Sequence, residues 1–130
     1  MQVYVPIDPD AVTYEQTKPF AHAVADLLEN RRPELVVSSM SKAQRPGRVL
    51  IDWSQNDQHK TTVAVYSMRA RAEPSVSTPV SWAEVQTCAD AGDPALLEFA
   101  PRVVLERFAR GGDPFAEVAS RRQELPALGG

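Results

Sequence analysis

The pattern of apolar and polar positions predicts one amphipathic helix in the first quarter of the chain, within "TKPFAHAVADLLENRRPE". Its apolar side chains recur at helical spacing, at Phe20, Val24, Leu27 and Leu28. Thr17 is the expected N-cap, and Pro33 is the expected stop, because the residue before a proline disfavours helical geometry. His22 lies off the apolar stripe, so a surface histidine is favoured over a metal ligand or a catalytic base.

Short strands are predicted by alternation or β-branched residues in residues 1–7, 34–40, 48–54 and 61–71. In residues 48–54, alternation places Val49, Ile51 and Trp53 on one face. Asp52 then lies on the other face, between Leu50 and Ser54. Residues 55–59, "QNDQH", have the length of a hairpin connection. We therefore expect residues 48–54 and 61–71 to pair antiparallel and to bring Asp52 near the arginine-bearing strand, in a register that the sequence leaves open.

The last third of the chain reads as an extended linker followed by short helices. Residues 72–79, "AEPSVSTP", are the linker, and "SWAE" is a capping box in which Ser81 and Glu84 bond reciprocally. Helices are expected in residues 101–112 and 113–126, each with a proline near its start, and residues 127–130 are expected to fray. The predicted fold is α/β (α+β): a mainly antiparallel sheet of about four strands with one packed helix and short C-terminal helices. It is a single partial domain, with a core in residues 1–72 and the linker and helices in 73–130.

Composition narrows the class of protein. The chain has 130 residues, 43% of them hydrophobic and 24% charged, as expected for one globular domain. No apolar run approaches the roughly 20 residues of a membrane span, and the N-terminus lacks a secretory pattern. The expected location is therefore the cytoplasm, at the nucleoid. Cys88 is the only cysteine, which excludes an internal disulfide and a cysteine zinc cage.

The net charge of −3 is distributed unevenly along the chain. Residues 41–72 hold six basic and two acidic side chains, a balance of +4, so the remainder carries −7. A basic segment in an acidic chain indicates either an anionic partner, such as a phosphate or a nucleic acid, or a solvated hairpin. Charge alone does not separate the two.

A carboxylate in a strand is costly to bury unless it is paired or bound to a metal. Asp52 therefore predicts either an ion pair, with Arg45, Arg48 or Arg69, or a divalent cation beside the phosphates of a nucleotide. The motifs GxxxxGK[ST], GxGxxG, HExxH and GxSxG are absent from the sequence, which disfavours the common hydrolase and P-loop classes. A single carboxylate does not build a two-metal site.

Several motifs carry a family resemblance: "IDWSQN", "KTTVAVYS", "RARAEPSVSTPVSW" and, before them, "TKPFA". From Gln2 to about Val118 the chain resembles the polymerase domain of bacterial DNA ligase D. That domain is a primase-polymerase of the archaeo-eukaryotic primase superfamily, used in non-homologous end joining. The resemblance implies a primase-polymerase fold and template-dependent nucleotidyl transfer to DNA ends with two divalent metals.

The resemblance also implies site residues. The family's third metal-binding aspartate falls on Asp52, which is thereby the expected catalytic metal ligand. Residues that hold the triphosphate or approach DNA fall on matching motif positions: Arg45, Gln55, Lys60 and Arg69, with Ser67 and Arg71 as neighbours. The implied cofactor is Mn²⁺ or Mg²⁺ and the implied substrate a nucleoside triphosphate. The implied partners are a DNA end, Ku protein and a ligase domain.

The family pattern also has an upstream DxD pair of metal carboxylates and an "SGGKG"-like segment, so this sequence resembles the C-terminal portion only. Asp8 and Asp10 lie two apart, but they follow the first predicted strand and do not match the DxD context. We expect a truncated reading frame, an expression fragment, or one half of a split protein whose other half is a separate chain. Alone, it is expected not to polymerise, and whether it is an enzyme stays open. The alternatives are a non-catalytic module that binds nucleotides or DNA ends, and a decayed fragment.

Overall fold

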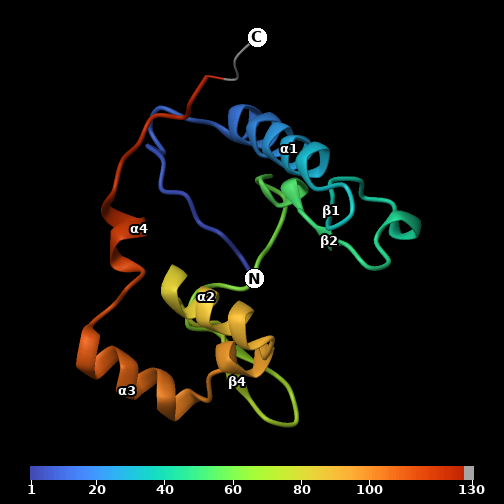
Figure 1. Cartoon of the computed structure of the whole chain (residues 1–130). Coiled ribbons are helices and arrows are strands. Elements are labelled where there is room, and N and C mark those ends of the chain that lie inside the picture. Colours follow the sequence, from blue (N-terminus) through green and yellow to red (C-terminus); the bar gives the residue numbers. More distant parts are fainter. Residues whose placement is uncertain (128–130) are drawn as a thin grey trace. The chain divides into compact units, whose positions relative to one another are not determined.

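The computed structural model describes residues 1–127 and divides into two compact units (Figure 1). The α1 unit comprises Pro6–Thr62 with the residues from Arg121 on, and the α3 unit comprises Met1–Val5 with Val63–Ser120. The expected fraying concerns mainly residues 128–130, which lie outside the described part of the chain. The predicted division of the chain near residue 72 stays a prediction.

The predicted first helix is confirmed as α1, Tyr14–Arg31. It begins one turn earlier than expected, because Thr13 and not Thr17 is the N-cap. The Thr13 N–H donates to Gln16 Oε1 at 2.8 Å, which satisfies a donor that would otherwise be free at the start of the helix. The helix ends just before Pro33, as the steric restriction on pre-proline residues requires.

The residues that α1 buries differ from those that its apolar pattern predicts. Its buried residue is Ala25, at 0% exposure, whereas Val24, Leu27 and Leu28 are 37%, 48% and 39% exposed. The helix contacts β1 and the 3₁₀ turn at Trp53–Gln55. The apolar stripe therefore stays largely open to solvent in this structure.

The sheet of the α1 unit is a parallel pair, β1 (Val36–Val37) and β2 (Val49–Leu50), with Val36 opposite Val49. Figure 1 shows it next to the C-terminal end of α1. Residues 38–48 connect the two strands and include a short 3₁₀ helix, η1, Lys42–Gln44. Val37 is fully buried and forms the centre of this unit's core with Ala25.

The expected antiparallel hairpin of residues 48–54 with 61–71 is wrong, because β2 pairs with β1 instead. After Leu50 the chain leaves the strand, and Trp53–Gln55 forms a 3₁₀ helix, η2, with Asp52 at its N-cap. The physical reason is the run of polar side chains, which offers the backbone local hydrogen bonds in place of a ladder. Strand alternation therefore does not determine how Asp52 and Trp53 are oriented.

The α3 unit contains the second strand pair, β3 (Met68–Arg69) and β4 (Ser75–Val76), which run antiparallel with Met68 opposite Val76. The pairing continues beyond the strands, because the Tyr66 N–H donates to Ser77 O at 2.7 Å. The segment expected to be only a linker thus supplies a strand. Its β-branched Val76 is half-buried and suits a strand, and its N–H donates to Phe99 O at 3.0 Å, a distant partner that local loop propensity does not take into account.

Three helices follow in the α3 unit: α2 (Trp82–Ala91), α3 (Pro101–Gly111) and α4 (Ala116–Ser120), with a 3₁₀ turn, η3 (Pro94–Leu97), between the first two. The predicted capping box is confirmed, since Ser81 Oγ accepts from the Glu84 N–H and the Ser81 N–H donates to Glu84 Oε2 at 2.8 Å. Gly92 ends α2 in the left-handed conformation, with φ 63°. Phe99 and Val104 form the core of this unit.

The α/β class is confirmed, although the strands are shorter than predicted and lie in two sheets. The predicted first strand is wrong: residues 1–8 are irregular, and no neighbouring strand in the described part of the chain pairs with them. A strand needs a ladder partner, and the alternation of residues 1–7 does not supply one. Among residues 1–127, no helix is both long and apolar enough to cross a membrane.

Candidate metal and nucleotide site

Asp52 is an exposed carboxylate with both oxygens held locally. The Ser54 hydroxyl donates to Oδ1 at 2.6 Å, and the Gln55 side-chain amide donates to Oδ2 at 3.1 Å. The Ser54 hydrogen bond is the largest cause that lowers the pKa of Asp52, with smaller contributions from Gln55 and from the charge of Lys60. The carboxylate is therefore ionised at neutral pH and oriented by its neighbours.

Three of the other predicted site residues share the α1 unit with Asp52, and two of them act on its carboxylate. Gln55 bonds to it directly, and Lys60 is near enough for its charge to act on it. Lys60 is exposed and forms no ion pair with the residues that the structure describes. Its ammonium group remains available to an anion from solution.

Arg45, in the same unit, is anchored by its own neighbourhood. One of its terminal nitrogens, Nη2, donates to the Met40 carbonyl at 2.6 Å, whereas Nε is buried and has no hydrogen-bond partner in the described structure. A buried donor without a partner costs free energy, which a bound acceptor would recover. Nε is closed to solvent in this structure, and the predicted role of Arg45 stays a prediction.

The remaining predicted residues belong to the α3 unit. Arg69 is the second residue of β3, is exposed, and forms no ion pair within residues 1–127. Arg71 pairs with Glu98 at 3.5 Å, and Ser67 is half-buried with its carbonyl accepting from the Ser77 N–H. Asp52 and Arg69 fall in different units, so their predicted proximity stays a prediction.

Arg69 and Arg71 line a cavity of about 600 Å³ that lies wholly within the α3 unit. Its other walls are mostly apolar, with Trp82, Val85 and Leu97 among them. A cavity of this size can hold a small ligand or a segment of polypeptide. Its two arginines are predicted site residues, which the other cavity of the unit does not contain.

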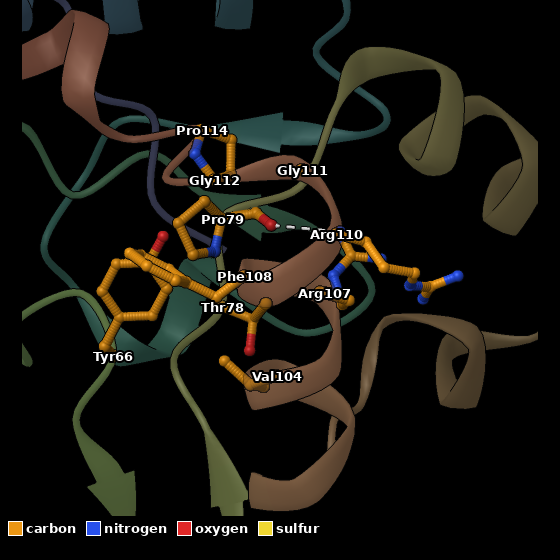
Figure 2. Close-up of a pocket in the computed structure, with 10 residues that line it drawn as sticks. All are labelled: Tyr66, Thr78, Pro79, Val104, Arg107, Phe108, Arg110, Gly111, Gly112 and Pro114. Atoms are coloured by element: carbon orange, nitrogen blue, oxygen red, sulfur yellow. Dashed lines mark hydrogen bonds between the residues drawn. The ribbon is translucent and has the colours of Figure 1, made fainter.

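A second cavity of the same unit, about 320 Å³, contains none of the predicted site residues (Figure 2). Figure 2 shows Val104, Phe108 and Gly111 spaced along α3, with Tyr66 reaching the pocket from another segment. Tyr66 has a left-handed backbone, φ 64°, and its hydroxyl donates to Asp113. Burial and that carboxylate raise the pKa of Tyr66 to about 12, so its phenol stays protonated and is a poor general base.

Arg107 also lines this smaller cavity, and it is occupied by structural contacts. Its Nη1 donates to Glu84 Oε1 at 2.6 Å, and its guanidinium lies 4.6 Å from the centre of the Phe99 ring. The hydrogen bond from Arg107 lowers the pKa of Glu84 to about 2. The pair joins α2 to α3 and occupies the Arg107 guanidinium in a structural contact.

The donor set at Asp52 fits one ligand of a hard divalent cation. Mn²⁺ and Mg²⁺ take oxygen ligands, and an exposed, ionised carboxylate oriented by the Ser54 hydroxyl and the Gln55 amide meets that requirement. Within the described residues, no group of three or more histidine, cysteine, aspartate or glutamate side chains is placed to hold a metal. Asp52 is therefore suited to complete a site, and does not by itself constitute one.

Sequence reasoning did not identify three residues that support this site. Ser54 orients the carboxylate, while Lys18 and His22 of α1 contact the turn that follows it. Ser54 had a visible signal, because a serine two residues after an aspartate favours a local side-chain bond. Lys18 and His22 had only their spacing of one helical turn, which does not indicate what they contact.

The comparisons with known proteins define first the fold and then the family. The structure is similar to that of the polymerase domain from Mycobacterium tuberculosis ligase D in complex with DNA, with a TM-score of 0.76 and 40% identity. That match covers 86% of this chain and 37% of the solved chain. The fold is therefore that of part of such a polymerase domain.

The model of the family described as "LigD, primase-polymerase domain" matches residues 1–115. The chain is 42% identical over 113 residues to the multifunctional non-homologous end joining DNA repair protein LigD of Mycobacterium tuberculosis strain H37Rv. It is 32% identical over 126 residues to the bifunctional non-homologous end joining protein LigD of Bacillus subtilis strain 168. The chain belongs to the LigD primase-polymerase domain family, which confirms the resemblance noted in its motifs.

The chain spans only part of these relatives. The match to the Mycobacterium tuberculosis protein includes 87% of this chain and 14% of that protein. The match to the Bacillus subtilis protein includes 97% of this chain and 20% of that protein. The relatives thus contain long stretches with no counterpart in this sequence. What those proteins do as wholes is not a property of this segment alone.

Proposed function

We propose that this chain is part of a nucleotidyltransferase that extends DNA ends in non-homologous end joining, and that Asp52 is one carboxylate ligand of its divalent metals. The observation that carries the proposal is the Asp52 carboxylate, which is exposed, ionised and oriented by Ser54 and Gln55 within the family-matched segment. The names of the relatives refer to end joining, and the solved relative is in complex with DNA. The site of action would be the nucleoid, in the cytoplasm.

The proposed division of labour follows from charge and exposure. Asp52 would hold Mn²⁺ or Mg²⁺, which when bound would offset negative charge on the phosphoryl oxygens. Lys60 and Arg69, both exposed, would contact the triphosphate or the DNA backbone. Arg45 and Gln55, with Ser67 and Arg71 as weaker members, would complete the nucleoside triphosphate and DNA contacts. Ku protein or a ligase domain would be partners at the DNA end.

The further metal carboxylates would come from polypeptide outside these residues, in the same protein or in another chain. Two observations support this. The described residues hold no cluster of three potential metal ligands, and the apolar stripe of α1 is exposed at Val24, Leu27 and Leu28. Exposed apolar side chains in a row are typical of a surface that further polypeptide covers.

The first test is primer extension by the isolated chain with Mn²⁺, a primed template and nucleoside triphosphates. We expect no template-dependent addition, because one carboxylate does not position two metals. The matched control is a complete polymerase domain of a LigD relative under the same conditions. Extension by the isolated chain that disappears in Asp52→Ala would contradict the expected inactivity, whereas extension unaffected by Asp52→Ala would contradict the role of Asp52.

The second candidate function is a non-catalytic module that binds nucleotides or DNA ends, favoured by the exposed Arg69, which has no ion-pair partner among residues 1–127. DNA-end binding measured against salt concentration separates the two. In both readings Arg69→Ala weakens binding and reduces the magnitude of the salt slope by about 1, as loss of one phosphate contact does. Arg102→Ala is the matched control, because Arg102 is 90% exposed and already paired with Glu106.

The dependence of nucleotide binding on Mn²⁺ then decides between the two candidate functions. If Mn²⁺ strengthens nucleotide binding and Asp52→Ala removes that gain, the metal-ligand role is supported. If binding is independent of Mn²⁺ and survives Asp52→Ala unchanged, the binding module is the better description. DNA and nucleotide binding that are both unaffected by Arg69→Ala would contradict both proposals.

A further inference from the structure

The turn that carries Asp52 is closed by backbone hydrogen bonds among its own residues, with the Trp53 N–H donating to Ile51 O at 2.9 Å and the Asp57 N–H to Gln55 O at 2.9 Å. The 3₁₀ helix η2 has only three residues, and the Gln55 N–H to Asp52 O distance is 3.4 Å, long for a hydrogen bond. The strand before it ends at Leu50, so no ladder continues through Asp52. Among the described residues, the backbone bonds of residues 52–60 run to residues 51–57, so contacts from elsewhere in the unit set where the turn lies against α1.

Trp53, the residue after Asp52, is held on two sides. Its indole Nε1 donates to the Ser38 carbonyl at 3.0 Å. The His22 ring of α1 stacks on the indole, with 4.0 Å between ring centres and 20° between planes. Stacked rings at this separation add attraction beyond their buried area, and together the two contacts fix the plane of the indole.

The far end of the turn is held by a second residue of α1. Lys18 Nζ lies 2.5 Å from Asp57 Oδ2, and the Asp57 side chain is only 22% exposed. The same carboxylate accepts from the His59 N–H at 2.9 Å through its other oxygen. The hydrogen bond from Lys18 is the largest cause of the lowered pKa of Asp57, which keeps that carboxylate charged.

Lys18 and His22 are four residues apart, so they lie on the same face of α1, one turn apart. One contacts the residue next to Asp52, and the other contacts the residue at the end of the turn. Between these two anchors lie Ser54 and Gln55, the donors to the Asp52 oxygens. One face of α1 thus contacts the turn on both sides of Ser54 and Gln55.

We propose that Lys18 and His22 are positioning residues: through Asp57 and Trp53 they hold the turn that places Asp52, and so raise its affinity for a divalent cation. The part concerning the cation rests on the proposed function, whereas the part concerning the turn does not. His22 acts through the face of its ring and is not itself a ligand. Outer contacts of this kind typically change metal affinity by about 10–100-fold where they touch the ligand directly. We expect a smaller effect, about 3–10-fold, because each residue here acts through one intermediary.

The first measurement reports the position of Trp53 without any metal. In a Trp82→Phe background Trp53 is the only tryptophan, and its accessibility to acrylamide is measured by fluorescence quenching. We expect His22→Ala to increase quenching, and His22→Phe, which keeps a flat ring, to restore the parent value. Backbone amide shifts of Ser54 and Gln55 should move in Lys18→Ala and return in Lys18→Arg. Lys42→Ala, an exposed lysine of the same unit, is the matched control and should change neither.

In the second measurement, Mn²⁺ is titrated into the same chains, and the paramagnetic broadening of the Ser54 and Gln55 amide signals reports binding. We expect His22→Ala and Lys18→Ala to need about 3–10 times more Mn²⁺ for half-maximal broadening, and His22→Phe and Lys18→Arg to need about as much as the parent. Asp52→Asn should abolish the local broadening. Urea unfolding of each variant verifies that the chain is folded.

The outcomes separate the two proposals. Broadening that is absent from residues 52–55 in the parent chain would contradict the metal role of Asp52, while the quenching and shift data would still decide the positioning role. Unchanged quenching in His22→Ala together with unchanged shifts in Lys18→Ala would overturn the positioning inference. If the variants displace the turn but leave the Mn²⁺ affinity unaltered, the proposed effect of Lys18 and His22 on cation binding is overturned.

Discussion

The ion pair between Glu84 and Arg107 makes a quantitative prediction about stability. Glu84 caps the start of α2, and Arg107 lies on α3, so the pair joins two helices of the α3 unit. The perturbation is Glu84→Gln, which keeps an oxygen to accept from the Ser81 N–H but removes the charge. The capping box is thereby retained while the ion pair is lost.

The magnitude follows from the pKa of Glu84, which is about 2 in the folded chain against an ordinary value of 4.5, chiefly because of the hydrogen bond from Arg107. At about 1.4 kcal/mol for each factor of ten, the full difference would be about 3.4 kcal/mol. The Arg107 and Glu84 side chains are 29% and 34% exposed, so solvent screens part of this energy. We expect Glu84→Gln to lower the free energy of unfolding by about 1–2 kcal/mol at pH 7.

The pH dependence has a definite sign. Because the pKa of Glu84 is lower in the folded chain than in the unfolded one, its stabilising contribution is complete above pH 5 or so. It is lost progressively as the pH falls through 4.5 toward 2. The difference between the parent chain and Glu84→Gln should therefore shrink across this range.

The assay is urea unfolding of both chains at pH 7 and at steps down to pH 3. The control is Glu106→Gln, which breaks the exposed Arg102–Glu106 pair, whose side chains are 90% and 55% exposed. That change should alter the free energy of unfolding by no more than about 0.5 kcal/mol. A loss for Glu84→Gln as small as the control's, or one that is equal at pH 7 and pH 3, would refute the reasoning.

Two further predictions concern local structure. Gly92→Ala should destabilise the chain by about 1 kcal/mol in urea unfolding, because φ is 63° at the end of α2, whereas Gly111→Ala, at a helical position with no atom nearby, should be neutral or slightly stabilising. Equal effects of the two changes would contradict this. Ser54→Ala should raise the pKa of Asp52 in a carboxyl NMR titration, and Ser54→Thr, which keeps the hydroxyl, should leave it low. An unchanged pKa of Asp52 in Ser54→Ala would show that the Ser54 hydroxyl is not the main cause of the lowered pKa.

The features that the sequence predicted well depend on neighbours along the chain. The capping box of Ser81 and Glu84, the helix starting at Pro101 and the helix ending before Pro33 each involve residues within a few positions of one another. Their physics is local, since a cap or a proline acts on the next turn of the backbone. The same holds for the family motifs, which are short runs such as "IDWSQN".

The features that were predicted incorrectly depend on partners far along the chain. Whether residues 1–7 form a strand, and whether β2 pairs with β1 or with the following run, depends on which segments meet. The candidate site shows the same division. The carboxylate of Asp52 could be selected from its motif, but not its bond to Ser54 or the anchoring of its turn by Lys18 and His22.

The sequence by itself therefore determined where helices occur, the capping box at Ser81, the family and the chemical type of the residues at the site, whereas the start of α1 and the length of α4 differ from the prediction. Only the tertiary structure decided the strand pairing, the exposure of the apolar stripe on α1 and the contacts that hold the Asp52 turn. The physical reason is that a helix satisfies its backbone within itself, whereas strand ladders and side-chain contacts are satisfied by residues whose proximity only folding establishes.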